Sequence, residues 1–159
     1  MAIQVGERVP EGTLTQMTDK GPAPVTTAEL FAGKKVVVFA VPGAFTPTCS
    51  RQHLPGYVAQ HDKIKATGVD TIACLAVNDV FVMDAWGKGA GAEGKVLMLA
   101  DGNADYAKAL GMDVDFGKFG MGLRCKRFSM VVEDGVVKTL NVEQPGEFKV
   151  SSAEHTCGL

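Results

Sequence analysis

Residues 34–49 read KKVVVFAVPGAFTPTC, an apolar run followed by a turn that ends on a cysteine. The apolar residues Val36 to Val41 predict a buried strand, and the segment from Pro47 onward has the length of a helix. Cys49 therefore lies at the junction between a predicted strand and a predicted helix. A thiol at a helix N-terminus faces unpaired backbone N–H groups and the positive end of the helix dipole, which both favour the thiolate. Because the thiolate is the nucleophilic form, we predict that Cys49 is reactive.

Apolar runs and helical spacings alternate along the rest of the chain. Strands are predicted over five runs rich in β-branched or large apolar residues: Val36 to Val41, Thr71 to Val77, Val96 to Leu99, Phe128 to Val132 and Val136 to Leu140. Helices are predicted over Pro47 to Ala66, Val80 to Trp86 and Ala104 to Leu110. This alternation indicates an α/β fold with a central sheet.

Two local signals refine the scheme. The run Glu133-Asp134-Gly135 carries the Asp-Gly signal of a tight hairpin between the last two strands, so that edge of a mixed sheet should be antiparallel. Pro55 lies inside the first helical segment, where its missing N–H and its ring oppose a regular helix. We expect Pro55 to kink this helix or to separate it into two pieces.

The length, charge and composition of the chain limit the classes of protein to which it can belong. Its 159 residues fit a single domain, 1–159, that can bury a core without disulfide or metal staples. The formal net charge of −2 gives no strong positive field, so we expect neither a nucleic-acid nor an anionic-membrane partner. The N-terminus lacks a signal-peptide pattern, and no uncharged apolar run is long enough to span a bilayer. We expect a cytoplasmic protein, although a chain already stripped of a targeting peptide would look the same.

The four cysteines are widely and irregularly spaced, at Cys49, Cys74, Cys125 and Cys157. A chain of this size does not need a disulfide framework, so these thiols indicate chemistry or core packing. The cysteines and histidines do not complete a recognisable set of metal ligands, and we predict no metal site.

The turn PGAFTPTC, Pro42 to Cys49, resembles the active-site loop of peroxiredoxins. Its exact residues resemble those of the type II, or peroxiredoxin-five-like, subfamily. The resemblance continues through SRQHLPGY after Cys49, VNDVFVMDAW from Val77 and GLRCKRFS from Gly122, so it covers most of the chain. It implies a thioredoxin-like fold, with a central mixed β-sheet flanked by helices, in an enzyme that works without a cofactor. It also implies a homodimer.

The function that this resemblance implies is that of a thiol-dependent peroxidase in antioxidant defence and redox homeostasis. Cys49 would reduce hydrogen peroxide or an alkyl hydroperoxide and become a sulfenic acid, which glutathione, glutaredoxin or thioredoxin would recycle. A thioredoxin-type disulfide exchanger would need C-x-x-C, whereas Thr46 stands in the place of the first cysteine. The alternative is a non-enzymatic peroxide sensor that passes oxidation to a partner protein through a mixed disulfide.

Three residues join Cys49 in the implied catalytic site. Thr46 lies three residues before Cys49, where its hydroxyl could approach the sulfur and the peroxide. Pro42 matches the proline that shields the cysteine in the family, and Arg124 matches the arginine that stabilises the thiolate and polarises the peroxide. Arg127 could be a second cation near the site or part of a structural ion pair.

His53 lies four residues after Cys49, on the same helical face, which invites a Cys-His pairing of nucleophile and base. A structural role is favoured, because the helix dipole and Arg124 can already supply the thiolate.

The thiol that resolves the sulfenic acid is left open by the sequence. Cys74 matches a cysteine that some type II members use as an internal resolver, but its apolar neighbours also fit an inert buried thiol. Cys157 near the C-terminus and Cys125 beside Arg124 are weaker candidates, and an external thiol is a full alternative. Phe45, Phe116 and Phe119 could form an apolar collar for organic peroxides or part of a dimer surface, although core packing is the commoner role of aromatic residues.

Overall fold

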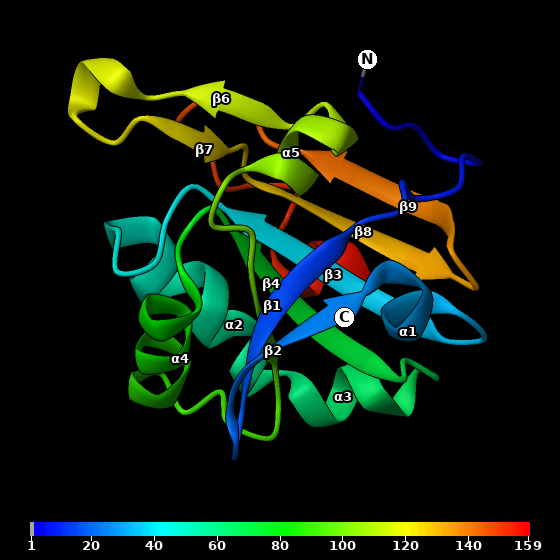
Figure 1. Ribbon diagram of the computed structural model, residues 1–159. Helices are drawn as coiled ribbons and strands as arrows, with labels where there is room; N and C mark the ends of the chain where they lie inside the picture. The colour runs from blue at the N-terminus through cyan, green and yellow to red at the C-terminus, as the bar shows by residue number, and fades with distance from the viewer. Residues whose placement is uncertain (1) are drawn as a thin grey trace.

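The computed structural model describes residues 2–159 and contains a seven-stranded mixed sheet in the order β2-β1-β5-β4-β3-β8-β9 (Figure 1). The strands are β1 (Thr13–Thr18), β2 (Gly21–Thr26), β3 (Lys35–Val41), β4 (Thr71–Ala76), β5 (Leu97–Ala100), β8 (Phe128–Glu133) and β9 (Val136–Val142). Strands β3, β4 and β5 are parallel, and the remaining pairings in this sheet are antiparallel. A separate two-stranded sheet joins β6 (Asp113–Asp115) to β7 (Leu123–Cys125).

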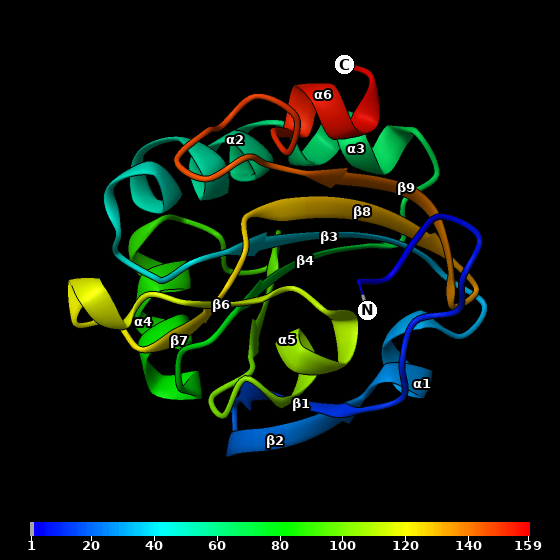
Figure 2. The ribbon, with the colours of Figure 1, turned by 90° about the horizontal axis from the view of Figure 1, so that it is seen from above.

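Helices cover both faces of the large sheet. Figure 2 shows α2 (Leu54–Ala59), α3 (His61–Ala66) and α6 (Ala153–Cys157) on one side, with α1 (Thr27–Phe31) and α5 (Asp105–Leu110) on the other. Helix α4 (Val80–Gly89) shares the apolar cluster of α2 and α3. The short helices η1 (Cys49–His53) and η2 (Gly117–Phe119) complete the set. None of the helices in residues 2–159 is long and apolar enough to cross a membrane.

The buried strand β3 forms the centre of this fold. Residues 36–41 are all buried, because β4 and β8 flank β3 in the sheet and helices cover both faces. The alternation of its side chains divides the interior into two apolar clusters, with Val36, Val38 and Ala40 on one face and Val37 and Phe39 on the other. The predicted thioredoxin-like fold with a central mixed sheet is confirmed.

The hairpin between β8 and β9 is confirmed in detail. Glu133 pairs with Val136, so only Asp134 and Gly135 form the turn. Both have positive φ, 48° and 82°, which is the geometry that an Asp-Gly hairpin turn requires.

The five predicted strands are present, but the elements at the margins of the fold were not predicted. Strands β1 and β2 contain mainly polar or small residues, and Pro22 and Pro24 interrupt any strand signal in β2. The three-residue strands β6 and β7 and the five-residue helices α1 and α6 are too short for a periodic pattern.

The helical segment that follows Pro47 is divided, as expected, but not at Pro55. Its first described element after the opening turn is η1, a π-helix that begins at Cys49 and in which the N–H of Leu54 donates to the Cys49 carbonyl. Pro55 then stands within the first turn of α2, where a missing N–H is tolerated, and a break at Gln60 separates α2 from α3. The π-helical turn that begins at Cys49 therefore continues directly into α2, and the helical backbone breaks only at Gln60.

Candidate active site

Cys49 lies at the end of a loop that leaves the carboxyl end of β3. It is the first residue of η1, and its side chain is completely buried. Irregular π-type turns are rare and are often found at functional sites. The position agrees with the predicted junction between a strand and a helix.

Hydrogen bonds from its own residues and from the segment that follows β4 fix the loop. The Ala44 N–H donates to Asn78 Oδ1 at 2.9 Å, and the Thr46 hydroxyl donates to the Gly43 carbonyl at 2.7 Å. Between them, Phe45 has a positive φ of 65° and an exposed side chain. A phenylalanine in this conformation is strained unless its surroundings hold it.

Arg127 is the cation that contacts the thiol. Its Nη2 lies 3.0 Å from Cys49 Sγ and donates a hydrogen bond to it. The resemblance implied that Arg124 stabilises the thiolate and left Arg127 open as a second cation; in the structure it is Arg127 that contacts the sulfur. Arg127 immediately precedes β8, which pairs with β3 through Phe128 and Ala40, so the sheet brings Arg127 to the end of β3 beside the loop of Cys49.

Arg124 lies near the loop, but its hydrogen bonds go to backbone carbonyls. Its Nε donates to the Met121 carbonyl at 2.9 Å, and its Nη1 is 3.4 Å from the carbonyls of Pro42 and Val77. Arg124 belongs to β7 in the small sheet and pairs with Val114. It therefore braces the loop, and in residues 2–159 it makes no hydrogen bond to Cys49.

His53 is a neutral side chain in this site. Its Nε2 lies 2.9 Å from the Ser151 carbonyl, and because a carbonyl only accepts, Nε2 carries the proton. Its Nδ1 then accepts from Arg127 Nη1 at 2.8 Å. Burial, and secondly the charge of Arg127, lower the pKa of His53 to about 3. Both ring nitrogens are engaged away from the sulfur, so the geometry favours the structural role over that of a base for Cys49.

A cavity of about 410 Å³ opens beside Arg127. It is lined by Pro42, Thr48, Val114, Phe116, Lys126, Arg127 and residues 142–147. Pro42 and Phe116 thus belong to its wall, whereas Phe45 and Phe119 do not line it and are exposed. Apolar side chains on the wall and a guanidinium beside the thiol suit a small molecule with an apolar part.

The other three thiols differ in access, and all four cysteines are free. Cys74 is fully buried on β4, between Phe39 of β3 and Met98 of β5, and burial raises its pKa well above the ordinary value. Cys125 lies in the apolar cluster on the opposite face of the sheet from Cys49, and burial raises its pKa too. Cys157 on α6 is half-buried, with a pKa raised by burial to about 11.

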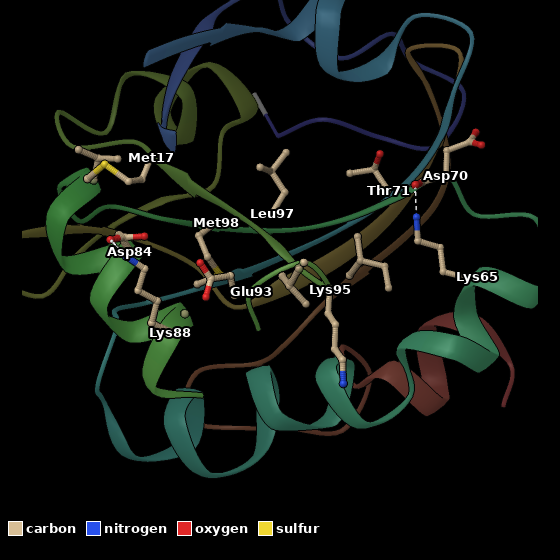
Figure 3. Close-up of a pocket in the computed structure, with 15 residues that line it drawn as sticks. Met17, Lys65, Asp70, Thr71, Asp84, Lys88, Glu93, Lys95, Leu97 and Met98 are labelled. Atoms are coloured by element: carbon tan, nitrogen blue, oxygen red, sulfur yellow. Dashed lines mark hydrogen bonds and ion pairs between the residues drawn. The ribbon is translucent and has the colours of Figure 1, made fainter. Parts of the chain in front are cut away.

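A second cavity, of about 390 Å³, lies between α4, β5 and the start of β4 (Figure 3). Charged side chains at its rim already have partners within the protein: Lys88 pairs with Asp84, and Lys65 donates to the Asp70 carbonyl. It contains none of the predicted site residues. Within residues 2–159, no three His, Cys, Asp or Glu side chains gather in a way that could hold a metal ion.

The fold and this site together define a thioredoxin-like protein in which an arginine donates a hydrogen bond to a buried cysteine at the start of a helix. The sequence model of the redoxin family matches residues 4–156. Peroxiredoxin-2E-2, chloroplastic, from Oryza sativa subsp. japonica is 48% identical over 157 residues, which are 96% of this chain and 70% of that protein. Peroxiredoxin-2B from Arabidopsis thaliana is 44% identical over 153 residues, covering 96% and 94%. The crystal structure of reduced Prx3 from Vibrio vulnificus in complex with H2O2 superposes with a TM-score of 0.93 at 56% identity, covering 96% of each chain.

The chain belongs to the redoxin family, and its relatives within that family are peroxiredoxins. Its function is accordingly that of a thiol-dependent peroxidase with an antioxidant role.

Sequence reasoning named Arg127 as a possible second cation but did not single it out, and it missed the C-terminal part of the site. The contact of Arg127 could have been found from register, because a residue that immediately precedes a strand paired with β3 must lie near the end of β3. Ser151, whose carbonyl contacts His53, and Glu143, which accepts hydrogen bonds from Ser151, carry no sequence signal.

Proposed function

We propose that Cys49 attacks one oxygen of hydrogen peroxide or an alkyl hydroperoxide while Arg127 stabilises the thiolate and the developing charge. The sulfur–oxygen bond forms as the oxygen–oxygen bond breaks, so Cys49 is oxidised to a sulfenic acid. The leaving oxygen takes up a proton and departs as water or an alcohol. The observation that carries this proposal is the hydrogen bond of 3.0 Å from Arg127 to the Cys49 sulfur.

Thr46 acts in this proposal as an acceptor. Its hydroxyl hydrogen is committed to the Gly43 carbonyl, which leaves the oxygen lone pairs to accept a hydrogen bond from the O–H of the peroxide. Pro42 lines the cavity without offering an N–H donor and shields the thiol from water. Arg124 holds the Pro42 carbonyl and so maintains the shape of the loop.

The cavity supports alkyl hydroperoxides as substrates alongside hydrogen peroxide. Val114, Phe116, Val142 and Pro145 supply apolar surface on its wall. An alkyl group placed against these side chains would be removed from water while the peroxide group meets Arg127.

We propose that an external thiol resolves the sulfenic acid. Cys74 faces the same apolar cluster as Cys49 but is fully buried at the paired centre of the sheet, so a disulfide between them would require local unwinding around Cys49, and the raised pKa of Cys74 leaves little thiolate. Cys125 lies in the apolar cluster on the opposite face of the sheet from Cys49, so the sheet separates the two thiols. A small thiol such as glutathione, or a glutaredoxin or thioredoxin, would condense with the sulfenic acid with release of water, and a second thiol would then free Cys49 as a disulfide departs.

Mass spectrometry of the fully reduced protein after one equivalent of hydrogen peroxide, with no added thiol, tests this assignment. We expect a gain of oxygen confined to Cys49, and a mixed disulfide at Cys49 once glutathione is added. Loss of two hydrogens with a peptide linking Cys49 to Cys74 or Cys157 would overturn the external resolver. Rapid recycling by the small thiol would also separate the peroxidase from a sensor that requires a partner protein.

A homodimer in the cytoplasm is the proposed setting. The exposed Phe45, Phe81 and Phe119 belong to the loop before Cys49, to α4 and to η2, which lie toward the same side of the molecule (Figure 1). Apolar residues gathered in this way support a contact between subunits. Four unpaired thiols support a reducing compartment. Sedimentation velocity and cell fractionation test the two proposals.

A further inference from the structure

Glu143 is a buried carboxylate that the proposed reaction does not use. It follows β9, belongs to the wall of the cavity beside Arg127 and is 8% exposed. Its Oε2 accepts hydrogen bonds from the N–H groups of Lys149, Val150 and Ser151, each at 2.8 Å, and from the Ser151 hydroxyl at 2.7 Å. Burial opposes ionisation, but the hydrogen bonds from Ser151, Val150 and Lys149 outweigh it and lower the pKa of Glu143. The charged carboxylate of Glu143 thus anchors the segment of residues 149–151.

The anchored segment presents one carbonyl to the helix of Cys49. The Ser151 carbonyl accepts from the Tyr57 hydroxyl at 2.8 Å and from His53 Nε2 at 2.9 Å. Ser151 is completely buried, and the ring of Tyr57 is stacked on Phe39 of β3. The carbonyl therefore has little freedom, and it sets both the tautomer and the orientation of the His53 ring.

The orientation of His53 in turn decides where the Arg127 guanidinium lies. Arg127 Nη1 donates to His53 Nδ1 at 2.8 Å, and its Nη2 donates to the Cys49 sulfur at 3.0 Å. Guanidinium nitrogens occupy a rigid planar fork, so fixing one nitrogen limits the positions of the other. The guanidinium also lies over the ring of Phe148, with 5.9 Å between Arg127 Cζ and the ring centroid.

We propose that Glu143 is a positioning residue for the thiol of Cys49, acting through Ser151, His53 and Arg127. This inference rests on the proposed function, because it assumes that Arg127 serves the thiolate. Glu143 needs no contact with the peroxide. By holding the Ser151 carbonyl in place it keeps the guanidinium pre-positioned at the sulfur, and such positioning raises the rate without adding a group to the reaction.

The test is Glu143→Gln, which removes the charge and half of the acceptor capacity, with Glu133→Gln as the matched control. Glu133 is the last residue of β8, does not line the cavity, and pairs at the surface with Lys35 Nζ at 3.9 Å. Two quantities are measured: the pH profile of Cys49 alkylation by iodoacetamide, and kcat/KM for hydrogen peroxide. We expect Glu143→Gln to move the alkylation profile to higher pH and to lower kcat/KM about tenfold. Glu133→Gln should change neither.

A purely structural role for Glu143 would lower thermal stability and leave the alkylation profile in place. A folded Glu143→Gln protein with the wild-type profile therefore overturns the proposal. If that variant does not fold, Ser151→Ala removes a single hydrogen bond of the anchor, and it should shift the profile in the same direction by a smaller amount. An unshifted profile in Ser151→Ala then counts against the proposal.

A double-mutant cycle separates this inference from the function on which it rests. In a His53→Leu background the chain is already broken, so Glu143→Gln should shift the profile no further, whereas additive shifts contradict action through His53. Arg127→Ala gives the independent reference. If Arg127→Ala leaves alkylation unchanged, the proposed role of Arg127 fails. If Arg127→Ala shifts it and Glu143→Gln does not, only the role of Glu143 fails.

Discussion

Cys49 is held from two sides by contacts of different kinds. On the loop side, Arg124 and Asn78 bind backbone atoms of the turn that precedes the cysteine. On the helix side, Arg127 and His53 form a chain of side-chain contacts that ends on the sulfur itself. The loop side thus fixes the shape of the approach, and the helix side fixes the charge at the thiol. Two arginines only three positions apart in sequence divide these tasks.

The largest effect should come from breaking the helix side. Arg127→Ala removes the cation and the donor at Sγ, and we expect kcat/KM for hydrogen peroxide to fall about a hundredfold or more. Arg124→Ala, the matched variant of the loop side, should cost about tenfold, since it relaxes backbone positions only. Stopped-flow peroxide reduction by both folded variants measures the difference. Equal losses would show that the division between the two sides is wrong.

Gly43 offers a way to disturb the loop side without touching either arginine. A Cβ at Gly43 would lie 2.8 Å from Arg124 Nη1 and 3.3 Å from Thr46 Cγ2. We expect Gly43→Ala to slow peroxide reduction by up to about tenfold, because Arg124 must move, while the pH profile of Cys49 alkylation stays unchanged. The double variant with Arg124→Ala should be little slower than Arg124→Ala alone.

The matched control for this substitution is Gly102→Ala, whose Cβ would meet its nearest neighbour at an ordinary 3.9 Å. A shifted alkylation profile in Gly43→Ala would mean that the loop also sets the charge at the sulfur.

The smallest effect concerns the pH dependence of stability on the helix side. The pKa of His53 falls from 6.5 to about 3 on folding, so the unfolded chain binds the proton more readily than the folded protein. His53 therefore favours the folded state above about pH 6.5 and progressively opposes it as the pH falls toward 3. His53→Gln retains an amide that can donate and accept, but it does not titrate.

Urea unfolding of the wild type and His53→Gln between pH 7 and pH 4.5 should reveal a shallower loss of stability in the variant. The depressed pKa of Glu143 acts in the same direction only below about pH 4.5, outside this window. Parallel curves for the two proteins would contradict a neutral His53.

The parts of the molecule that were predictable from sequence are those with strong local patterns. The strand from Val36 to Val41 and the turn at Asp134 and Gly135 follow from hydrophobic run and turn chemistry. The position of Cys49 was predicted correctly because the cysteine lies between two such patterns, the apolar strand before it and the helical segment after it.

The partner of Cys49 was not predictable in the same way. Arg124 and Arg127 occur in one short stretch, GLRCKRFS, and only the pairing of Phe128 with Ala40 decides which of them reaches the thiol. The contact of Glu143 with Ser151 depends on the path of the C-terminal segment between them. Neither contact repeats with a period, so both emerge only once the chain is folded.

The two prolines of β2 have a consequence for how copies of this protein can associate. Alternate residues of a strand direct their N–H groups to the same edge, and the ladder with β1 runs unbroken past Pro22 and Pro24. The missing donors therefore fall on the outer edge of β2, which offers a further strand an incomplete set of hydrogen bonds. At the opposite edge, the N-terminal segment already bonds to β9 through Gly6, Glu7 and Val137. The sheet is thus closed to growth at β2 and partly covered at β9, which directs self-association toward side-chain surfaces and away from fibre-like strand addition.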